Sequence, residues 1–191
     1  MEAYQLRKDT SMGYTHSWGW ADALPNTERF PLWSADVKRL LACYKENPPL
    51  KPWEEEPWWY LAPHVMGKWD TTICGPYGFD EPIIRPDFVA FNGNRETENE
   101  CEAFIVDARM LKYRHFFWCK TWGNPYDLLV TASLIRLQHY FPQVAIYCGG
   151  GVEGLDDGVQ LCRIAFGIGR NPLRDPVYCR FVDRIFEERS A

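Results

Sequence analysis

The chain has 191 residues, of which 46% are hydrophobic and 25% are charged, and both fractions are ordinary for a globular protein. Its net charge of −5 disfavours a nucleic-acid partner, because binding phosphate backbones requires clustered lysine and arginine. No hydrophobic stretch reaches the ~18 residues of a membrane span, and the N-terminus lacks the apolar core of a signal peptide. We therefore expect a cytoplasmic protein without a membrane partner.

The cysteines and histidines favour neither a disulfide nor a metal site. Seven cysteines stand singly, and no pair has C-x-x-C spacing. Four dispersed histidines form no H-x-H or H-x-x-x-H pattern. Cys119 and His115 are four residues apart on a predicted strand, too far for a nucleophile and its base to touch. We predict seven free thiols in a reducing cytosol, no bound metal and no cofactor.

The first third of the chain predicts one strand, one helix and one extended segment. Residues 12–20 alternate between two faces, as a strand does. A helix follows, with Ser34 as its N-cap, and it ends at Asn47, before two prolines. Residues 47–63 contain five prolines and three tryptophans. Proline is excluded from helix interiors and ladders, so this segment is predicted to be an extended strap whose rings cover the core or bind a ligand.

The middle of the chain predicts a run of strands. Residues 71–74, 87–92 and 102–107 have the residue types of strands, and residues 115–121 are a further candidate. The stretch 93–101 is polar and acidic, and it is too long for a tight hairpin. We expect it to be an exposed loop.

The last third predicts helices around one short strand. Asn124 is a favoured helix cap, with Pro125 at the first helical position and Asp127 in the first turn. An apolar strand at 144–148 follows. The helix expected at 157–168 is apolar nearly all round, which predicts that it is buried.

Strands gather in a central run rather than alternating strictly with helices. This order predicts an α+β fold, in which helices pack on a mostly antiparallel or mixed central sheet in two or three layers. The length favours a single globular domain over residues 1–191.

A glycine-rich turn follows the strand at 144–148. Residues 149–154 match G-x-G-x-x-G between a strand and a helix, the context of a dinucleotide fingerprint. No strand with an acidic end follows, however, and Glu153 and Asp156 crowd the position of a pyrophosphate. A flexible strand-to-helix turn is the favoured interpretation, and a nucleotide cradle is the alternative.

Polar residues collect where the predicted elements end. Lys120 and Thr121 precede a helix N-terminus, where backbone N–H groups, a lysine and a hydroxyl can receive an anion. The alternative is that Asp127 closes the cap, Lys120 is solvated and Thr121 packs in the interior. Because binding groups usually lie on strand ends and loops, the ligand-binding candidates are Tyr14, His16, Asn92, Glu102, Lys120, Thr121 and Tyr126.

Four motifs in order resemble an uncharacterised family of bacterial, phage and fungal proteins. They are Gly13-Tyr14-Thr15-His16-Ser17-Trp18, Phe91-Asn92-Gly93, Glu102-Ala103-Phe104, and Cys119-Lys120-Thr121 with Pro125-Tyr126-Asp127. The similarity runs from residue 13 to about residue 165. In that family the strand after the long helix ends in Ser-Asp-Gly, whereas here it reads Cys148-Gly149-Gly150. The resemblance implies a compact cytosolic domain and assigns no reaction.

Two functions remain open from the sequence. The first is a binding or interaction module, such as a phage or bacterial conflict protein, whose partner is a small anionic ligand or a protein. The second is an enzyme for a small anionic or nucleotide-like substrate, with Lys120 and Thr121 as binding groups and His16, Tyr14 or Glu102 as acid or base. An enzyme predicts a concave pocket beside Lys120, and a module predicts an exposed aromatic patch.

Overall fold

The computed structural model describes residues 15–20, 27–49, 69–113 and 115–174. Tyr14 lies outside these residues. The predicted strap at 47–63 also lies outside them, apart from residues 47–49. The helices are α1 (Phe30–Glu46), α3 (Asp127–Tyr140) and α4 (Asp156–Phe166), with short 3₁₀ turns between elements. The strands are β1 (Thr15–Trp20), β2 (Ile73–Cys74), β3 (Ile83–Arg85), β4 (Phe88–Gly93), β5 (Phe104–Asp107), β6 (His115–Lys120) and β7 (Ala145–Cys148).

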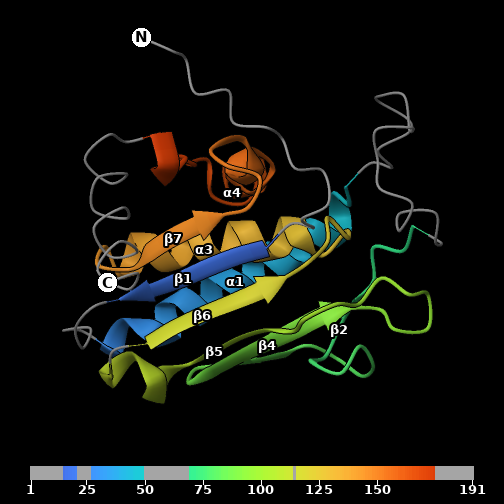
Figure 1. The fold of residues 1–191 in the computed structure, drawn as a ribbon, viewed down its shortest axis with the longest axis horizontal. Helices are drawn as coiled ribbons and strands as arrows, with labels where there is room; N and C mark the ends of the chain where they lie inside the picture. The colour runs from blue at the N-terminus through green and yellow to red at the C-terminus, as the bar shows by residue number, and fades with distance from the viewer. Residues whose placement is uncertain (1–14, 21–26, 50–68, 114, 175–191) are drawn as a thin grey trace, which may run out of the picture.

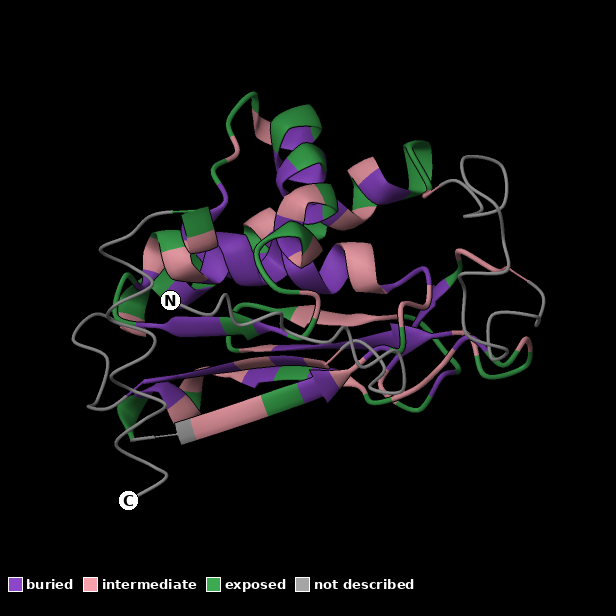
Figure 2. Ribbon diagram, turned by 45° about the horizontal axis from the view of Figure 1, so that its top comes forward, coloured by how far each residue is buried: buried purple, intermediate pink, exposed green. Residues whose placement is uncertain are grey.

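The strands form two antiparallel groups. One sheet has the order β6-β1-β7, and in the other β4 pairs with β2, β3 and β5. The groups meet where the backbone N–H of Glu102, just before β5, donates to the carbonyl oxygen of Lys120 at the end of β6. Helices α1 and α3 lie behind the three-stranded sheet in Figure 1, and the turned view of Figure 2 places the helices together on one side. The predicted α+β fold with a largely antiparallel sheet is confirmed.

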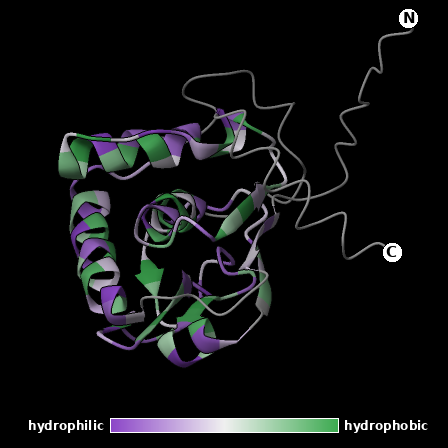
Figure 3. Ribbon diagram, turned by 90° about the vertical axis from the view of Figure 1, so that its left-hand side faces the viewer, coloured by the Kyte–Doolittle hydropathy of each residue, from purple (hydrophilic) through white to green (hydrophobic). Residues whose placement is uncertain are grey.

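Alternation along β1 determines which side chains enter the core. His16, Trp18 and Trp20 point toward the helices and are buried, whereas Ser17 on the opposite face is half-buried. The Trp18 ring packs 5.1 Å from that of Phe104, centroid to centroid. Burying each such ring contributes about 2–3 kcal/mol. In Figure 3 the strands are mainly hydrophobic (green), while the helices mix green and purple along their length.

The start of α1 corrects the predicted cap. The helix begins at Phe30, with Arg29 as its N-cap five residues earlier than expected, and a proline occupies its first turn. Ser34 is therefore inside the helix, where its hydroxyl is buried and donates to the carbonyl oxygen of Pro31. Proline fits the first turn because no N–H is needed there, so the earlier start is favourable. The predicted end at Asn47 is confirmed.

Two further predictions about helices were wrong. Asn124 is not the cap of α3: it forms a turn with its N–H bonded to the Thr121 carbonyl oxygen, and the helix begins at Asp127. Helix α4 is buried on one side only, since Gln160, Arg163 and Ile164 are exposed. No helix among the described residues is long and apolar enough to cross a membrane.

Candidate functional site

Most of the candidate residues meet at one junction in the fold. Thr15, at the start of β1, is paired with Lys120 at the end of β6, which places His16 next to Cys119. Thr121 follows directly, and α3 begins six residues later at Asp127. The sheet thus brings the first strand, the end of β6 and the helix N-terminus together.

A buried ion pair holds this junction. His16 is fully buried, and its Nε2 lies 2.6 Å from Oδ1 of Asp127, whose side chain is 20% exposed. The hydroxyl of Thr121 donates to the same carboxylate oxygen. Burial by itself lowers the pKa of His16, but the Asp127 carboxylate outweighs it and raises that pKa to about 10. At neutral pH an imidazolium therefore ties β1 to the first turn of α3.

Two cysteines flank His16 on the inner face of the sheet. Cys119 and Cys148 are its partners on the neighbouring strands. The Cys148 thiol is close enough to raise the His16 pKa, although Nδ1 of His16 forms no hydrogen bond of regular geometry within the described structure. Cys148 is only 2% exposed, and Gly154 lies so close that an added Cβ would overlap its sulfur. Because substrate cannot reach a covered thiol, this cluster is not arranged as a nucleophile and base.

Tyr126 and Asn92 bond to backbone groups and are buried. The Tyr126 hydroxyl donates to the carbonyl oxygens of Glu102 (3.0 Å) and Lys120 (3.2 Å). The Asn92 amide donates to the carbonyl oxygen of Cys101 at 3.2 Å. Tyr126 therefore links the end of β6 to the segment before β5, and Asn92 links β4 to that same segment.

Lys120 and Glu102 are the candidates that reach the surface. The Glu102 carboxylate accepts from the backbone N–H of Lys120 at 2.7 Å. The Lys120 ammonium lies 4.8 Å from the centre of the Trp122 ring, in the range of a cation–π contact. Two cavities in the described part of the structure are lined by residues of α3, α4 and the segment 168–174 rather than by this pair. The described residues contain no cluster with the makeup of a metal site.

The outer face of the three-stranded sheet presents aromatic side chains that were not among the candidates. Ser17 on β1 is in register with Trp118 on β6 and Tyr147 on β7. These two rings are 60% and 54% exposed, and the Phe116 ring lies 6.4 Å from that of Trp118. We call Ser17, Phe116, Trp118 and Tyr147 the aromatic sheet face. The alternation of 115–121 could have revealed it, because an inward Cys119 requires an outward Trp118.

Comparison of the chain with protein families, with curated proteins and with solved structures gave no match. Two features of the structure therefore bear on function. The junction at His16 is internal and is held by the ion pair with Asp127, whereas Trp118 and Tyr147 of the aromatic sheet face are exposed. Exposed aromatic side chains of this kind are typical of surfaces that bind a partner.

Proposed function

We propose that this protein is a binding module that docks a protein partner on the aromatic sheet face. The observation that carries the proposal is the register of Trp118 and Tyr147 on either side of Ser17. Adjacent strands are about 4.8 Å apart, so the two aromatic residues are separated by roughly 10 Å. The small side chain of Ser17 lies between these two aromatic residues in the register of the sheet.

The energetics favour a partner that covers these rings. Completing the burial of a large apolar side chain contributes about 2 kcal/mol, and tryptophan and tyrosine are enriched among the residues that dominate binding energy. Lys120 and Glu102 lie beside the aromatic sheet face and supply charges of both signs, as the polar rim of an interface does. The net charge of −5 favours a protein over a nucleic acid.

The enzyme alternative has less support. It requires an acid or base beside Lys120 that substrate can reach, but His16 is fully buried and paired with Asp127. Glu102 is exposed, and one oxygen of its carboxylate accepts from the Lys120 backbone N–H. Tyr14, the third acid or base candidate, lies outside the described residues. We therefore carry only the binding function forward.

Partner capture by matched variants tests the proposal. The immobilised protein, the double variant Trp118→Ala/Tyr147→Ala and the control Tyr77→Ala are each exposed to extract of the source cells. Tyr77 is 80% exposed on a loop after β2, so its variant removes a ring from a different surface. We expect the wild type and the control to retain the same partner and the double variant to lose it. Equal retention by all three folded proteins would reject this face as the docking surface.

A further inference from the structure

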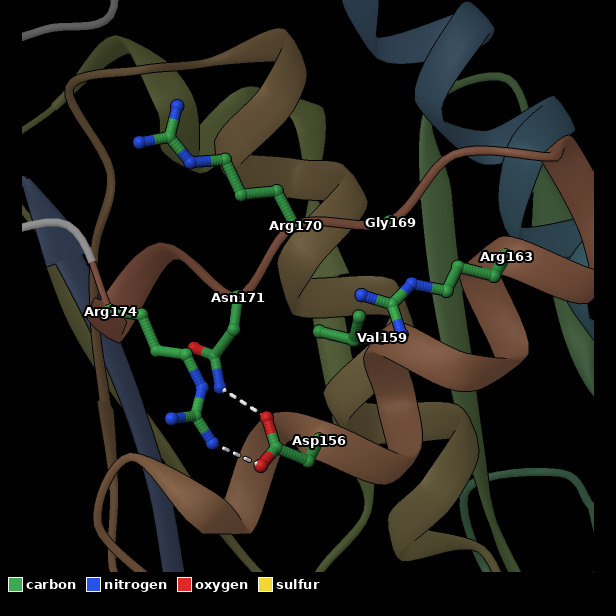
Figure 4. Close-up of a pocket in the computed structure, with 7 residues that line it drawn as sticks. All are labelled: Asp156, Val159, Arg163, Gly169, Arg170, Asn171 and Arg174. Atoms are coloured by element: carbon green, nitrogen blue, oxygen red, sulfur yellow. Dashed lines mark hydrogen bonds and ion pairs between the residues drawn. The ribbon is translucent and has the colours of Figure 1, made fainter.

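The cavity beside α4 is held by contacts within the chain. It has a volume of about 500 Å³, and Figure 4 shows the side chains of Arg174 and Asn171 directed at Asp156. These two residues donate to the two carboxylate oxygens of Asp156. Because these polar groups bond one another, a ligand gains less from them than from the exposed rings of the aromatic sheet face.

The aromatic sheet face presents its two exposed rings at a separation that the sheet determines. Trp118 and Tyr147 lie opposite Ser17, on the strands either side of β1, so their Cα atoms are roughly 10 Å apart. Both side chains are more than half exposed. A partner that covers both rings must therefore present two apolar groups at a similar separation.

Polyproline II is the regular backbone conformation that matches this separation most simply. It has three residues per turn and rises about 3.1 Å per residue, so residues i and i+3 lie on one side about 9.3 Å apart. Side chains on one side of a β-strand repeat every ~6.8 Å. In an α-helix, residues four apart are separated by ~6 Å along the axis, and only residues seven apart reach ~10.5 Å.

The indole of Trp118 distinguishes a polyproline II partner from a helical one. A tryptophan N–H usually has a hydrogen-bond acceptor when it is buried, so a partner that covers Trp118 must supply one. The carbonyl groups of polyproline II form no internal hydrogen bonds and stay available as acceptors. Those of an α-helix are bonded within the helix. A polyproline II segment can therefore satisfy the indole N–H while its rings pack on the aromatic side chains.

A contact of two rings also favours a partner that loses little entropy on binding. Ordering a flexible chain costs free energy for every residue that becomes fixed. Proline holds its φ angle near −65° before binding, so a proline-rich segment has less freedom to lose. A small surface such as the aromatic sheet face can then bind it with few contacts.

The charge of the protein favours basic residues beside the prolines. The chain carries a net charge of −5, and the exposed carboxylate of Glu102 lies at the end of β6, where it accepts from the Lys120 backbone N–H. The Lys120 ammonium lies over the Trp122 ring, 4.8 Å from its centre. A lysine or arginine of the partner can pair with Glu102, and opposite net charges speed the encounter.

We propose that the aromatic sheet face recognises a proline-rich segment in the polyproline II conformation. Prolines three residues apart pack on Trp118 and Tyr147, and a neighbouring basic residue pairs with Glu102. Docking of proline-rich segments on aromatic surfaces is a recurring mode of peptide recognition. The inference rests on the docking function proposed above and names the class of partner.

Titration of the isotope-labelled protein with synthetic peptides, followed by NMR, tests the proposal. The probe is a lysine followed by six prolines, and the matched control has the same lysine and only three prolines. We expect a saturable shift of the Trp118 indole signal, which is identified by its absence from Trp118→Ala. The longer peptide should bind about tenfold more tightly or better, because residues i and i+3 require at least four prolines to reach both rings.

Matched protein variants locate the binding surface. Tyr147→Ala should weaken binding of the six-proline peptide about tenfold or more. Tyr77→Ala should leave it unchanged, because Tyr77 is exposed on the loop after β2. Removal of a side chain that is more than half exposed leaves the fold intact for the measurement.

The outcomes separate the class of partner from the docking function itself. Absence of saturable binding by the six-proline peptide, equal binding of the two peptides, or equal affinity in wild type and Tyr147→Ala would overturn the proline-rich partner. Equal or tighter binding after the peptide lysine is replaced by glutamate would overturn the pairing with Glu102. If no proline peptide binds but Trp118→Ala/Tyr147→Ala still loses the partner captured from extract, the docking function stands and only the partner class is refuted.

Discussion

Replacing Asp127 with asparagine removes one charge of the buried ion pair and keeps the shape of the side chain. The pKa of His16 rises from its ordinary 6.5 to about 10 in the folded protein. That difference corresponds to about 5 kcal/mol of stability if the pair is fully formed. The Asp127 side chain retains 20% exposure, however, so we expect a cost nearer the lower end for a broken buried pair, about 3 kcal/mol.

The same ion pair makes the cost depend on pH. Because the folded pKa is raised, the contribution is complete below pH 6.5, declines as pH increases, and is lost above about 10. In Asp127→Asn no carboxylate opposes the effect of burial, which lowers the His16 pKa. Between pH 6.5 and about 10 the variant therefore gains no stability from protonation of His16. The stability curves of the two proteins should converge as pH approaches 10.

Urea unfolding across this pH interval measures the difference directly. The control is Asp87→Asn, whose side chain is 74% exposed and lies 3.6 Å from that of Arg85. Loss of such a surface ion pair should cost about 0.5 kcal/mol. Subtracting the free energy of unfolding of each variant from that of the wild type cancels the contribution of groups that titrate in both proteins. The reasoning is refuted if Asp127→Asn costs no more than the control, or if its cost stays constant from pH 6.5 to about 10.

Two further predictions concern the glycine-rich turn and the thiols. Gly154→Ala should cost about 2 kcal/mol because its Cβ overlaps the Cys148 sulfur. At Gly151 an added Cβ meets open space, but φ is +67°, so Gly151→Ala should cost about 1 kcal/mol. A larger loss of thermal stability in Gly151→Ala than in Gly154→Ala would contradict this prediction. In the native protein a thiol reagent should label half-buried Cys43 before fully buried Cys119. Mass spectrometry of the labelled peptides gives the order of labelling, and earlier labelling of Cys119 would disprove this prediction.

Local patterns predicted the elements that depend on local physics. The alternation of β1 placed His16 and Trp18 on one face because the side-chain period of a strand is two. The end of α1 followed from Asn47 and the prolines after it. Strand β3 was not predicted, because Ile83–Arg85 is only three residues long and gains its hydrogen bonds from β4.

Long-range contacts explain why the site could be predicted only in part. Asp127 is bonded to His16, 111 residues away in sequence, and no local pattern reveals such a partner. Grouping polar residues by element ends did predict that Lys120 and His16 lie near each other, as the pairing of β1 with β6 shows. It did not predict that His16, unlike Lys120, is fully buried.

Site-specific photo-cross-linking tests the proposed docking surface most directly. A photoreactive phenylalanine derivative replaces Trp118 in one protein and Tyr77 in another, and both are irradiated in extract of the source cells. Both positions are exposed, at 60% and 80%, so reagent access is comparable. The account predicts a discrete cross-linked partner from position 118 and none from position 77. Cross-linking from position 77 with none from position 118 would contradict it.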